Sequence, residues 1–165
     1  MIKASKKESI KASKKARKEG NRVAQLIKAN KTEFYIADVD LDDDTKDVIG
    51  GITCTVKTLG KVRAAFMLVS AGTKTLTVAC YVPTELNDKI DSKEWLSKAL
   101  VGIDYDSIVH DDTDTNTSYV SIDIELPFKL KDMVRGNGFA YLKKLGLMAD
   151  AEEESSEEFI GFDDF

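Results

Sequence analysis

The sequence has few of the residues on which most catalytic and metal sites depend. Its 165 residues include one histidine, His110, and two cysteines, Cys54 and Cys80. Both cysteines stand in apolar, β-branched runs without CxxC spacing, which predicts buried free thiols rather than a metal site or a disulfide. Carboxylates flank His110, which predicts an exposed loop rather than a catalytic base. P-loop, GxGxxG, HExxH and zinc-ligand spacings are also absent. We therefore expect a protein that is not an enzyme and holds no cofactor or metal.

Long apolar runs are lacking as well. No stretch approaches the roughly 18 apolar residues that a membrane-spanning helix needs. The lysine-rich start also has no apolar core of the kind found in a signal peptide. Free thiols fit a reducing compartment, so the sequence predicts a cytoplasmic protein with no membrane partner. A chain of this length buries roughly two-thirds of its unfolded surface, which is enough for one core.

Charge is abundant but unevenly distributed. Residues 1–32 contain eleven Lys and Arg against two Glu, a net charge of +9, whereas the whole chain carries −5. From Asp150 onward there are eight carboxylates and no cation. An asymmetry of this kind indicates a polyanionic partner, a regulatory tail, or both.

The apolar pattern predicts a small α+β domain. Strands are expected at residues 34–39, 64–70, 76–82 and 119–126, and helices at 92–103 and 129–147. Residues 45–61 are ambiguous because β-branched residues favour a strand, while apolar positions recur at helical spacing around two adjacent glycines. With a helix there, the order is β-α-β-β-α-β-α, with the helices on one face of the sheet. An acidic loop is expected at 104–117.

Three segments are expected along the chain: a basic helical arm at 1–31, the α+β domain at 32–148, and a disordered acidic tail at 149–165. Gly20 weakens the helix of the arm, so the part before it is expected to be exposed. The carboxylates of DVDLDDD at 38–44 lack the glycine and distal glutamate of an EF-hand loop, which favours a solvated turn over a metal site. Trp95 is expected in the core rather than stacked on a ligand.

Short motifs occur in a characteristic order along the middle of the chain. They are Leu59-Gly60-Lys61, Ala65 with Met67-Leu68, Cys80-Tyr81-Val82-Pro83, Lys89, Ser92-Lys93-Glu94-Trp95, and then Leu130, Phe139, Leu142 and Leu145-Gly146. Together they resemble the C-terminal domain of alanyl-tRNA synthetases, especially the eukaryotic form, over about residues 20–148. The resemblance implies a non-catalytic module that binds the outer corner of tRNA and promotes association, so a homo-oligomer is one expected state.

One region departs from that family. Its members carry a glycine-rich run between the Trp-containing helix and the last helix, where this chain has GIDYDSIVHDDTDTNTSY. An acidic loop at that place would repel phosphate. The chain also contains neither the aminoacylation domain nor the zinc-bearing editing domain. The resemblance therefore implies either a fragment of an alanine-tRNA ligase or a free-standing relative.

Cations are the candidate contacts for tRNA or another structured nucleic acid, because phosphate neutralisation dominates such binding. The candidates are Lys6, Lys7, Lys11, Lys14, Lys15, Arg17, Lys18, Arg22, Lys57, Lys61 and Arg63; a solvated, solubilising helix face is the competing interpretation. The alternative function is a protein–protein interaction module without RNA. In it the acidic tail would bind a protein partner through Phe159, Phe162 and Phe165, or would act only as a solubiliser.

Overall fold

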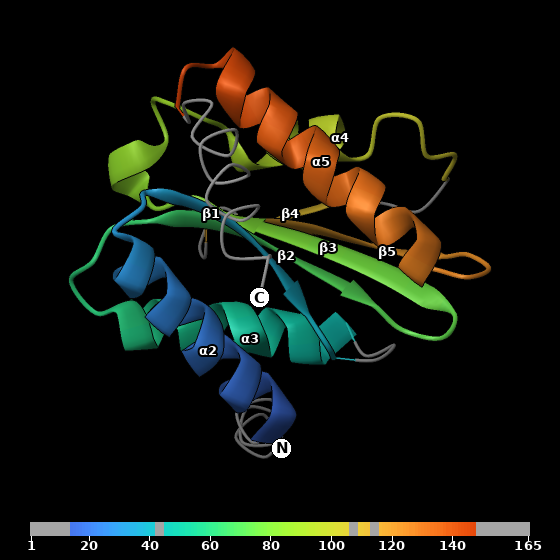
Figure 1. Cartoon of the computed structure of the whole chain (residues 1–165), viewed down its shortest axis with the longest axis horizontal. Helices are drawn as coiled ribbons and strands as arrows, with labels where there is room; N and C mark the ends of the chain where they lie inside the picture. The colour runs from blue at the N-terminus through green and yellow to red at the C-terminus, as the bar shows by residue number, and fades with distance from the viewer. Residues whose placement is uncertain (1–13, 42–44, 106–108, 113–115, 148–165) are drawn as a thin grey trace, which may run out of the picture.

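A five-stranded mixed sheet lies between two layers of helices in the computed structural model (Figure 1). The structure describes residues 14–41, 45–105, 109–112 and 116–147. The elements in chain order are α2 (Lys14–Asn30), β1 (Phe34–Val39), α3 (Thr45–Leu59), β2 (Ala65–Ala71), β3 (Thr75–Tyr81), the 3-10 turn η1 (Thr84–Leu86), α4 (Ser92–Ala99), β4 (His110–Asp112), β5 (Thr117–Asp123) and α5 (Phe128–Lys144). The α+β class and the basic helix that comes first are confirmed.

The strand order across the sheet is β1-β2-β3-β5-β4. β1 runs parallel to β2, and α3 forms the crossover between them. The remaining neighbours are antiparallel, including the predicted β2–β3 hairpin. β2 is buried along its whole length except for its last residue, Ala71. A central strand covered on both faces reads as a continuous apolar run, which is what the sequence AFMLVSA shows.

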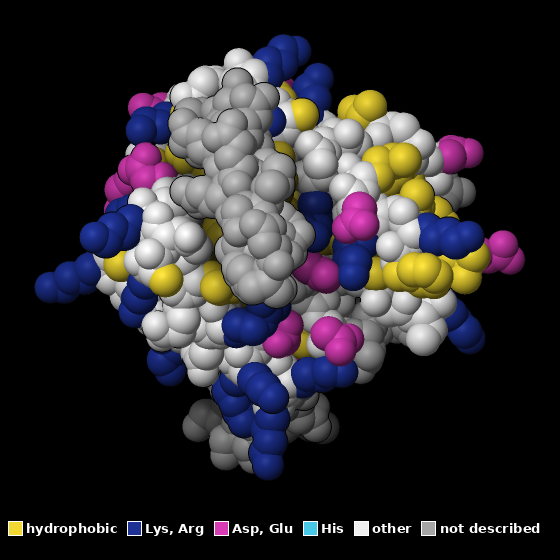
Figure 2. Space-filling model, in the orientation of Figure 1, with side chains coloured by type: hydrophobic (Ala, Val, Ile, Leu, Met, Phe, Trp, Pro, Cys, Tyr) yellow, Lys and Arg dark blue, Asp and Glu magenta, His cyan; other side chains and the backbone are white. Residues whose placement is uncertain are grey.

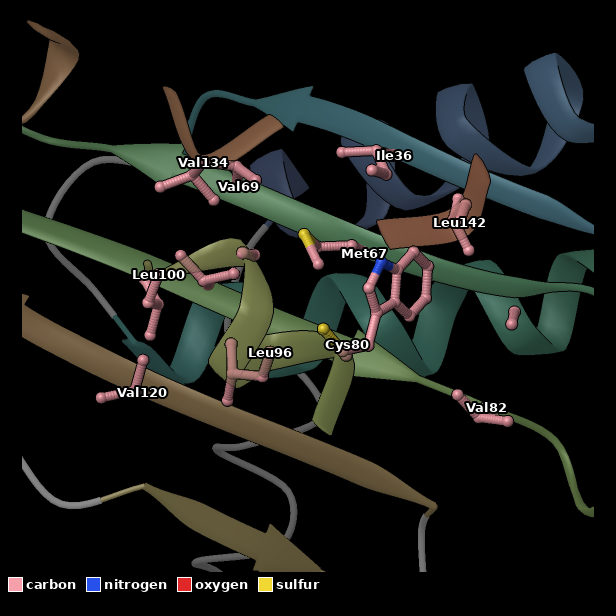
Figure 3. Close-up of a cluster of buried hydrophobic side chains, with 14 of the residues drawn as sticks. Ile36, Met67, Val69, Cys80, Val82, Leu96, Leu100, Val120, Val134 and Leu142 are labelled. Carbon is pink, nitrogen blue, oxygen red and sulfur yellow. The ribbon is translucent and has the colours of Figure 1, made fainter. Parts of the chain in front are cut away.

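Helices cover both faces of the sheet, so the prediction of helices on one face is wrong. Side chains alternate along a strand, and on β2 Phe66 and Leu68 join the core beneath α2 and α3. Met67 and Val69 join the core beneath α4 and α5, as Figure 3 shows. The sequence could not reveal this arrangement by alternation, because both faces of β2 are apolar.

Trp95 lies in the core between α4, α5 and the sheet, as expected. Its side chain is 0% exposed, and its Nε1 donates a hydrogen bond of 3.3 Å to the carbonyl oxygen of Gly138 on α5. A side chain on Gly138 would place its Cβ 2.7 Å from Cδ1 of Ile36 on β1. This glycine therefore lets α5 approach the sheet closely, which explains a glycine in the middle of a helix.

The ambiguous segment after β1 is a helix, α3, and its two glycines lie at the contact with α2. Gly50 approaches Cβ of Ala16, and Gly51 lies near the Ala16 carbonyl oxygen. Further along, the Thr55 hydroxyl shares its hydrogen between the carbonyl oxygen of Gly51 at 2.7 Å and that of Gly20 on α2 at 3.2 Å. Residues later in α2 contact residues later in α3, so the two helices run in the same direction and pack through small residues.

This packing begins near the described start of α2. Ala16 is 2% exposed and Gly20 is buried. Residues 14–19 are therefore packed on the domain rather than forming an exposed arm, while the rest of the predicted arm, residues 1–13, lies outside the described residues. The chain thus presents α2 in a fixed orientation from its first described turn onward.

The expected acidic loop contains a short edge strand, β4, that the sequence did not predict. His110, Asp111 and Asp112 are all exposed and pair with β5. Charged residues on an edge strand discourage pairing with another chain. Both cysteines are free thiols, as predicted, although Cys54 is only partly buried. Burial raises the pKa of the Cys80 thiol well above its ordinary value, which makes this thiol unreactive.

Candidate nucleic-acid interface

The buried stripe of α2 determines which of its cations face solvent. Ala16, Gly20, Val23, Ala24 and Ile27 face α3 and the sheet. At 3.6 residues per turn, the solvent side of the helix carries Lys14, Arg17, Lys18, Gln25 and Lys28, all of which are exposed. Lys and Arg side chains gather over the first turns of α2 in the lower part of Figure 2. The packing therefore holds a row of cations on the outside of the molecule.

Arg22 and Lys15 have local carboxylate partners instead. The Arg22 Nη2 donates to Glu19 Oε1 at 2.9 Å and to the carbonyl oxygen of Asp38 at 2.7 Å. Glu19 Oε1 also accepts from the backbone N–H of Asp40 at 3.2 Å. These bonds fasten α2 to the end of β1. Lys15 Nζ lies 3.9 Å from Asp40 Oδ1. Arg22 therefore has a structural role that sequence reasoning did not recognise.

The ionisation of this cluster follows from the same contacts. Burial raises the pKa of Glu19, but hydrogen bonds from Arg22 and from the Asp40 N–H outweigh burial, so the pKa lies below its ordinary value. The hydrogen bond to Glu19 raises the pKa of Arg22. Both groups are therefore charged at neutral pH, and the attachment of α2 to β1 is intact there.

The end of α3 adds further cations beside α2. The Thr58 hydroxyl donates to Asn21 Oδ1 at 2.6 Å, which marks the seam between the two helices on the solvent side. Lys57, the neighbour of Thr58, is exposed, as is Lys61 just after the helix. Arg63 is paired, because its Nε donates to Glu85 Oε2 at 2.7 Å and its Nη1 to the carbonyl oxygen of Lys61 at 2.9 Å.

The structure thus divides the eleven candidate cations into three groups and adds a twelfth cation, Lys28, to the first of them. Within the described residues, no carboxylate forms an ion pair with the exposed Lys14, Arg17, Lys18, Lys28, Lys57 or Lys61. We call these six residues the basic face. Lys15, Arg22 and Arg63 are engaged in ion pairs. Lys6, Lys7 and Lys11, like Phe159, Phe162 and Phe165 of the tail, lie outside the described residues.

Lys28 belongs to the basic face but was missing from the candidates chosen on the sequence. The signal was present in the helical spacing, because fourteen residues at 3.6 per turn place Lys28 within about 40° of Lys14 around the helix axis. Lys14 and Lys28 lie about 21 Å apart along that axis at 1.5 Å per residue. Phosphates of one strand of a duplex advance about 3.4 Å each, so the row spans roughly six phosphates.

A surface pocket of about 250 Å³ lies beside the basic face, where α3 ends; we call it the corner pocket. Its apolar lining residues are Val56, Leu59, Val62, Ala64 and Pro83. Its other lining residues are Gly60, Arg63, Tyr81, Thr84, Glu85 and Asn116. Burial raises the pKa of the Tyr81 phenol, and the nearby Glu85 carboxylate adds to this effect. Glu85's own backbone N–H and Arg63 hold the pKa of its carboxyl below the usual range.

His110 lies on the exposed edge strand β4 beside an aromatic ring. His110 stacks on Tyr119, with ring centroids 4.7 Å apart, and is exposed. In the part of the chain that the structure describes, no group of three or more His, Cys, Asp or Glu is placed to hold a metal ion. Asp42, Asp43 and Asp44 of the predicted turn lie outside that part. Within the same ranges, no helix is both long and apolar enough to cross a bilayer.

Comparisons with known proteins give no family for this chain. No family model matches it, and no curated protein gives a significant match. Among solved structures, one similar chain comes from the crystal structure of histidine kinase ThkA in complex with response regulator protein TrrA, at 11% identity and a TM-score of 0.24. The match covers 68% of this chain, which spans 40% of that chain's length. A likeness this distant carries no argument about fold or function.

Proposed function

We propose that this protein is a non-catalytic module that binds tRNA or another structured RNA through the basic face. The observation that supports this function is the orientation of α2. Its buried stripe and the Arg22 attachment to β1 hold Lys14, Arg17 and Lys18 outward, and no described carboxylate pairs with them. Cations arranged in a fixed row neutralise successive phosphates without first losing a local partner.

The acidic edge strand β4 lies far from the basic face. β4 lies at the opposite edge of the sheet from β1, the strand to which α2 is fastened. The exposed Asp111 and Asp112 of β4 therefore lie at the edge of the sheet that is farthest from the attachment of α2. The acidic segment that replaces the family's glycine-rich run would repel phosphate there without weakening the basic face. The sequence resemblance to the C-terminal domain of alanyl-tRNA synthetases favours tRNA as the RNA.

A salt titration tests this function directly. Fluorescence anisotropy with end-labelled tRNA, measured from about 50 to 300 mM KCl, gives the slope of log K against log salt. Neutralisation of about five phosphates predicts a slope of about −3.5 to −4.5. An unstructured oligonucleotide of equal length is the control for the preference for structured RNA. Undetectable binding at the lowest salt, or a slope near zero, would rule the function out.

A second candidate function is binding to a protein partner, favoured by apolar side chains exposed near the start of α5. Leu126, Phe128 and Met133 are 48%, 55% and 43% exposed. Val101 is 60% exposed and precedes Gly102, which lies against Met133. Leu126 also has a φ of 52°, a left-handed conformation that is uncommon for leucine. Clustered exposed apolar residues often mark protein interfaces.

A further inference from the structure

The corner pocket has the size of an aromatic side chain. Its volume is about 250 Å³, whereas an apolar cavity of about 150 Å³ is enough to bind a benzene ring. Val56, Leu59, Ala64 and Pro83 provide apolar walls. The pocket therefore suits a phenylalanine ring that enters from solvent.

Cations surround the pocket on the side of α3. Arg63 and Glu85 on the rim neutralise each other through their 2.7 Å ion pair. Lys57 follows the pocket residue Val56 on α3, and Lys61 stands between the pocket residues Gly60 and Val62. Both lysines are exposed, so they add two positive charges to this part of the surface. A ligand that complements the pocket carries an aromatic ring flanked by carboxylates.

We propose that the corner pocket binds the chain's own acidic tail through one of its three phenylalanines. Residues 148–165 contain Phe159, Phe162 and Phe165, eight carboxylates and no cation. The phenyl rings match the apolar walls of the pocket, and the carboxylates match Arg63 on its polar rim and the two lysines that adjoin it in the sequence.

The described part of the chain finishes at the same end of the strands as the pocket, which adjoins the start of β2 and the end of β3. Lys131, early in α5, forms an ion pair of 2.9 Å with Asp38 near the end of β1. Gly138, further along α5, lies against Ile36, nearer the start of β1. α5 therefore runs antiparallel to β1 and finishes beside the start of β1. The start of β1 pairs with the start of β2, which the pocket residue Ala64 precedes. Figure 1 shows the end of α5 and the end of α3 on the left of the molecule.

The tail is long enough to reach from α5 to the α3 side of the sheet. Eighteen residues span up to about 60 Å when extended, and a flexible chain of that length has an r.m.s. span of about 24 Å. Tethering of this kind gives an effective concentration in the millimolar range. Docking also places carboxylates near Lys57 and Lys61, so if the basic face binds RNA as proposed above, ion pairs with these two lysines lower RNA affinity several-fold.

Nuclear magnetic resonance of the full chain tests the docking without RNA. The wild-type chain is compared with a variant that carries Phe159→Ser, Phe162→Ser and Phe165→Ser. We expect the substitutions to shift the backbone amide signals of pocket residues such as Val62, Thr84 and Asn116. Raising NaCl from about 20 to 500 mM should move the wild-type signals toward those of the variant, because the attraction is partly electrostatic.

Two further variants locate the site. Val62→Glu places a carboxylate at the pocket, where Val62 is 41% exposed, and should abolish the effect of the Phe substitutions. Val101→Glu, at an exposed site after α4, is the matched control and should leave the effect intact. Unchanged pocket signals, or shifts confined to the start of α5, would overturn the proposal.

A dilution series completes the test. Shifts independent of protein concentration support docking within one molecule, whereas shifts that disappear on dilution would contradict it. The readout contains no RNA, so failure of tail docking is distinguishable from failure of RNA binding.

Discussion

Gly20→Ala tests whether the close contact between α2 and α3 positions the basic face. An added Cβ would lie 2.6 Å from Cβ of Cys54, 2.9 Å from the carbonyl oxygen of Gly51 and 3.1 Å from the backbone nitrogen of Thr55. None of these three atoms is the end of a flexible side chain. The helices must therefore separate, which removes the 3.2 Å contact of the Thr55 hydroxyl with the Gly20 carbonyl oxygen and leaves its 2.7 Å hydrogen bond to Gly51 within α3.

The magnitude of the effect follows from three contributions to the free energy of unfolding. Overpacking costs about 1–3 kcal/mol, and loss of the longer branch of the shared Thr55 hydrogen bond costs about 0.5 kcal/mol. The better helix propensity of alanine returns up to about 1 kcal/mol. We expect a net loss of about 2 kcal/mol, measured by urea unfolding, and a melting temperature lower by about 4–8 °C.

Gly136→Ala is the matched control on α5. Gly136 is exposed, and its added Cβ would meet no atom within 4 Å. The helix propensity then acts alone, so this substitution should stabilise the protein by about 0.5–1 kcal/mol. A Gly20→Ala protein as stable as the Gly136→Ala protein would refute the close packing of α2 on α3.

Two further predictions concern ionisable groups. Glu19→Gln should lower the free energy of unfolding at neutral pH by about 1–2 kcal/mol, because the charged hydrogen bonds from Arg22 and the Asp40 N–H are weakened. Since the Glu19 pKa lies below 4.5 in the folded protein, this difference from wild type should disappear as pH falls from 4.5 through the lowered pKa. A difference that persists in acid would contradict this assignment. Burial and the 2.9 Å hydrogen bond to Glu94 raise the pKa of Tyr141 from 10 to about 12. The wild-type protein should therefore lose stability relative to Tyr141→Phe as pH rises from 10 to 12. Parallel pH profiles of the two proteins in urea unfolding would show that this hydrogen bond is absent.

Much of the fold could be predicted because local patterns agree with the tertiary structure. The capping residue Asp91, whose side chain accepts from the Glu94 N–H at 3.0 Å, begins α4 where the sequence suggested. The turn before Thr75 closes the β2–β3 hairpin as expected. α3 was ambiguous because Gly50 and Gly51 lower helix propensity. Their reason is the approach of α2, a tertiary contact that no local pattern reveals.

The site was only partly predictable for a related reason. Charge counting found the basic segment, and helical spacing was enough to add Lys28 to it. Helical spacing could also have found the Glu19–Arg22 ion pair, which joins two residues three apart on α2. The sequence could not show that Glu85 engages Arg63, because that ion pair depends on how the elements pack. The corner pocket likewise combines residues from α3, β3 and η1, which lie far apart in the sequence.

The most direct test of the central claim compares two triple variants that remove the same charge from different faces. The α2 variant loses the three cations in the first turns of the basic face through Lys14→Ala, Arg17→Ala and Lys18→Ala. The control variant loses three exposed cations of α4 and α5 through Lys93→Ala, Lys129→Ala and Lys144→Ala. With labelled tRNA at several salt concentrations, the α2 variant should bind more weakly and its salt slope should be shallower by about 2–3. The control should keep a slope close to wild type. Equal losses in the two variants would mean that net charge, not the basic face, governs RNA binding.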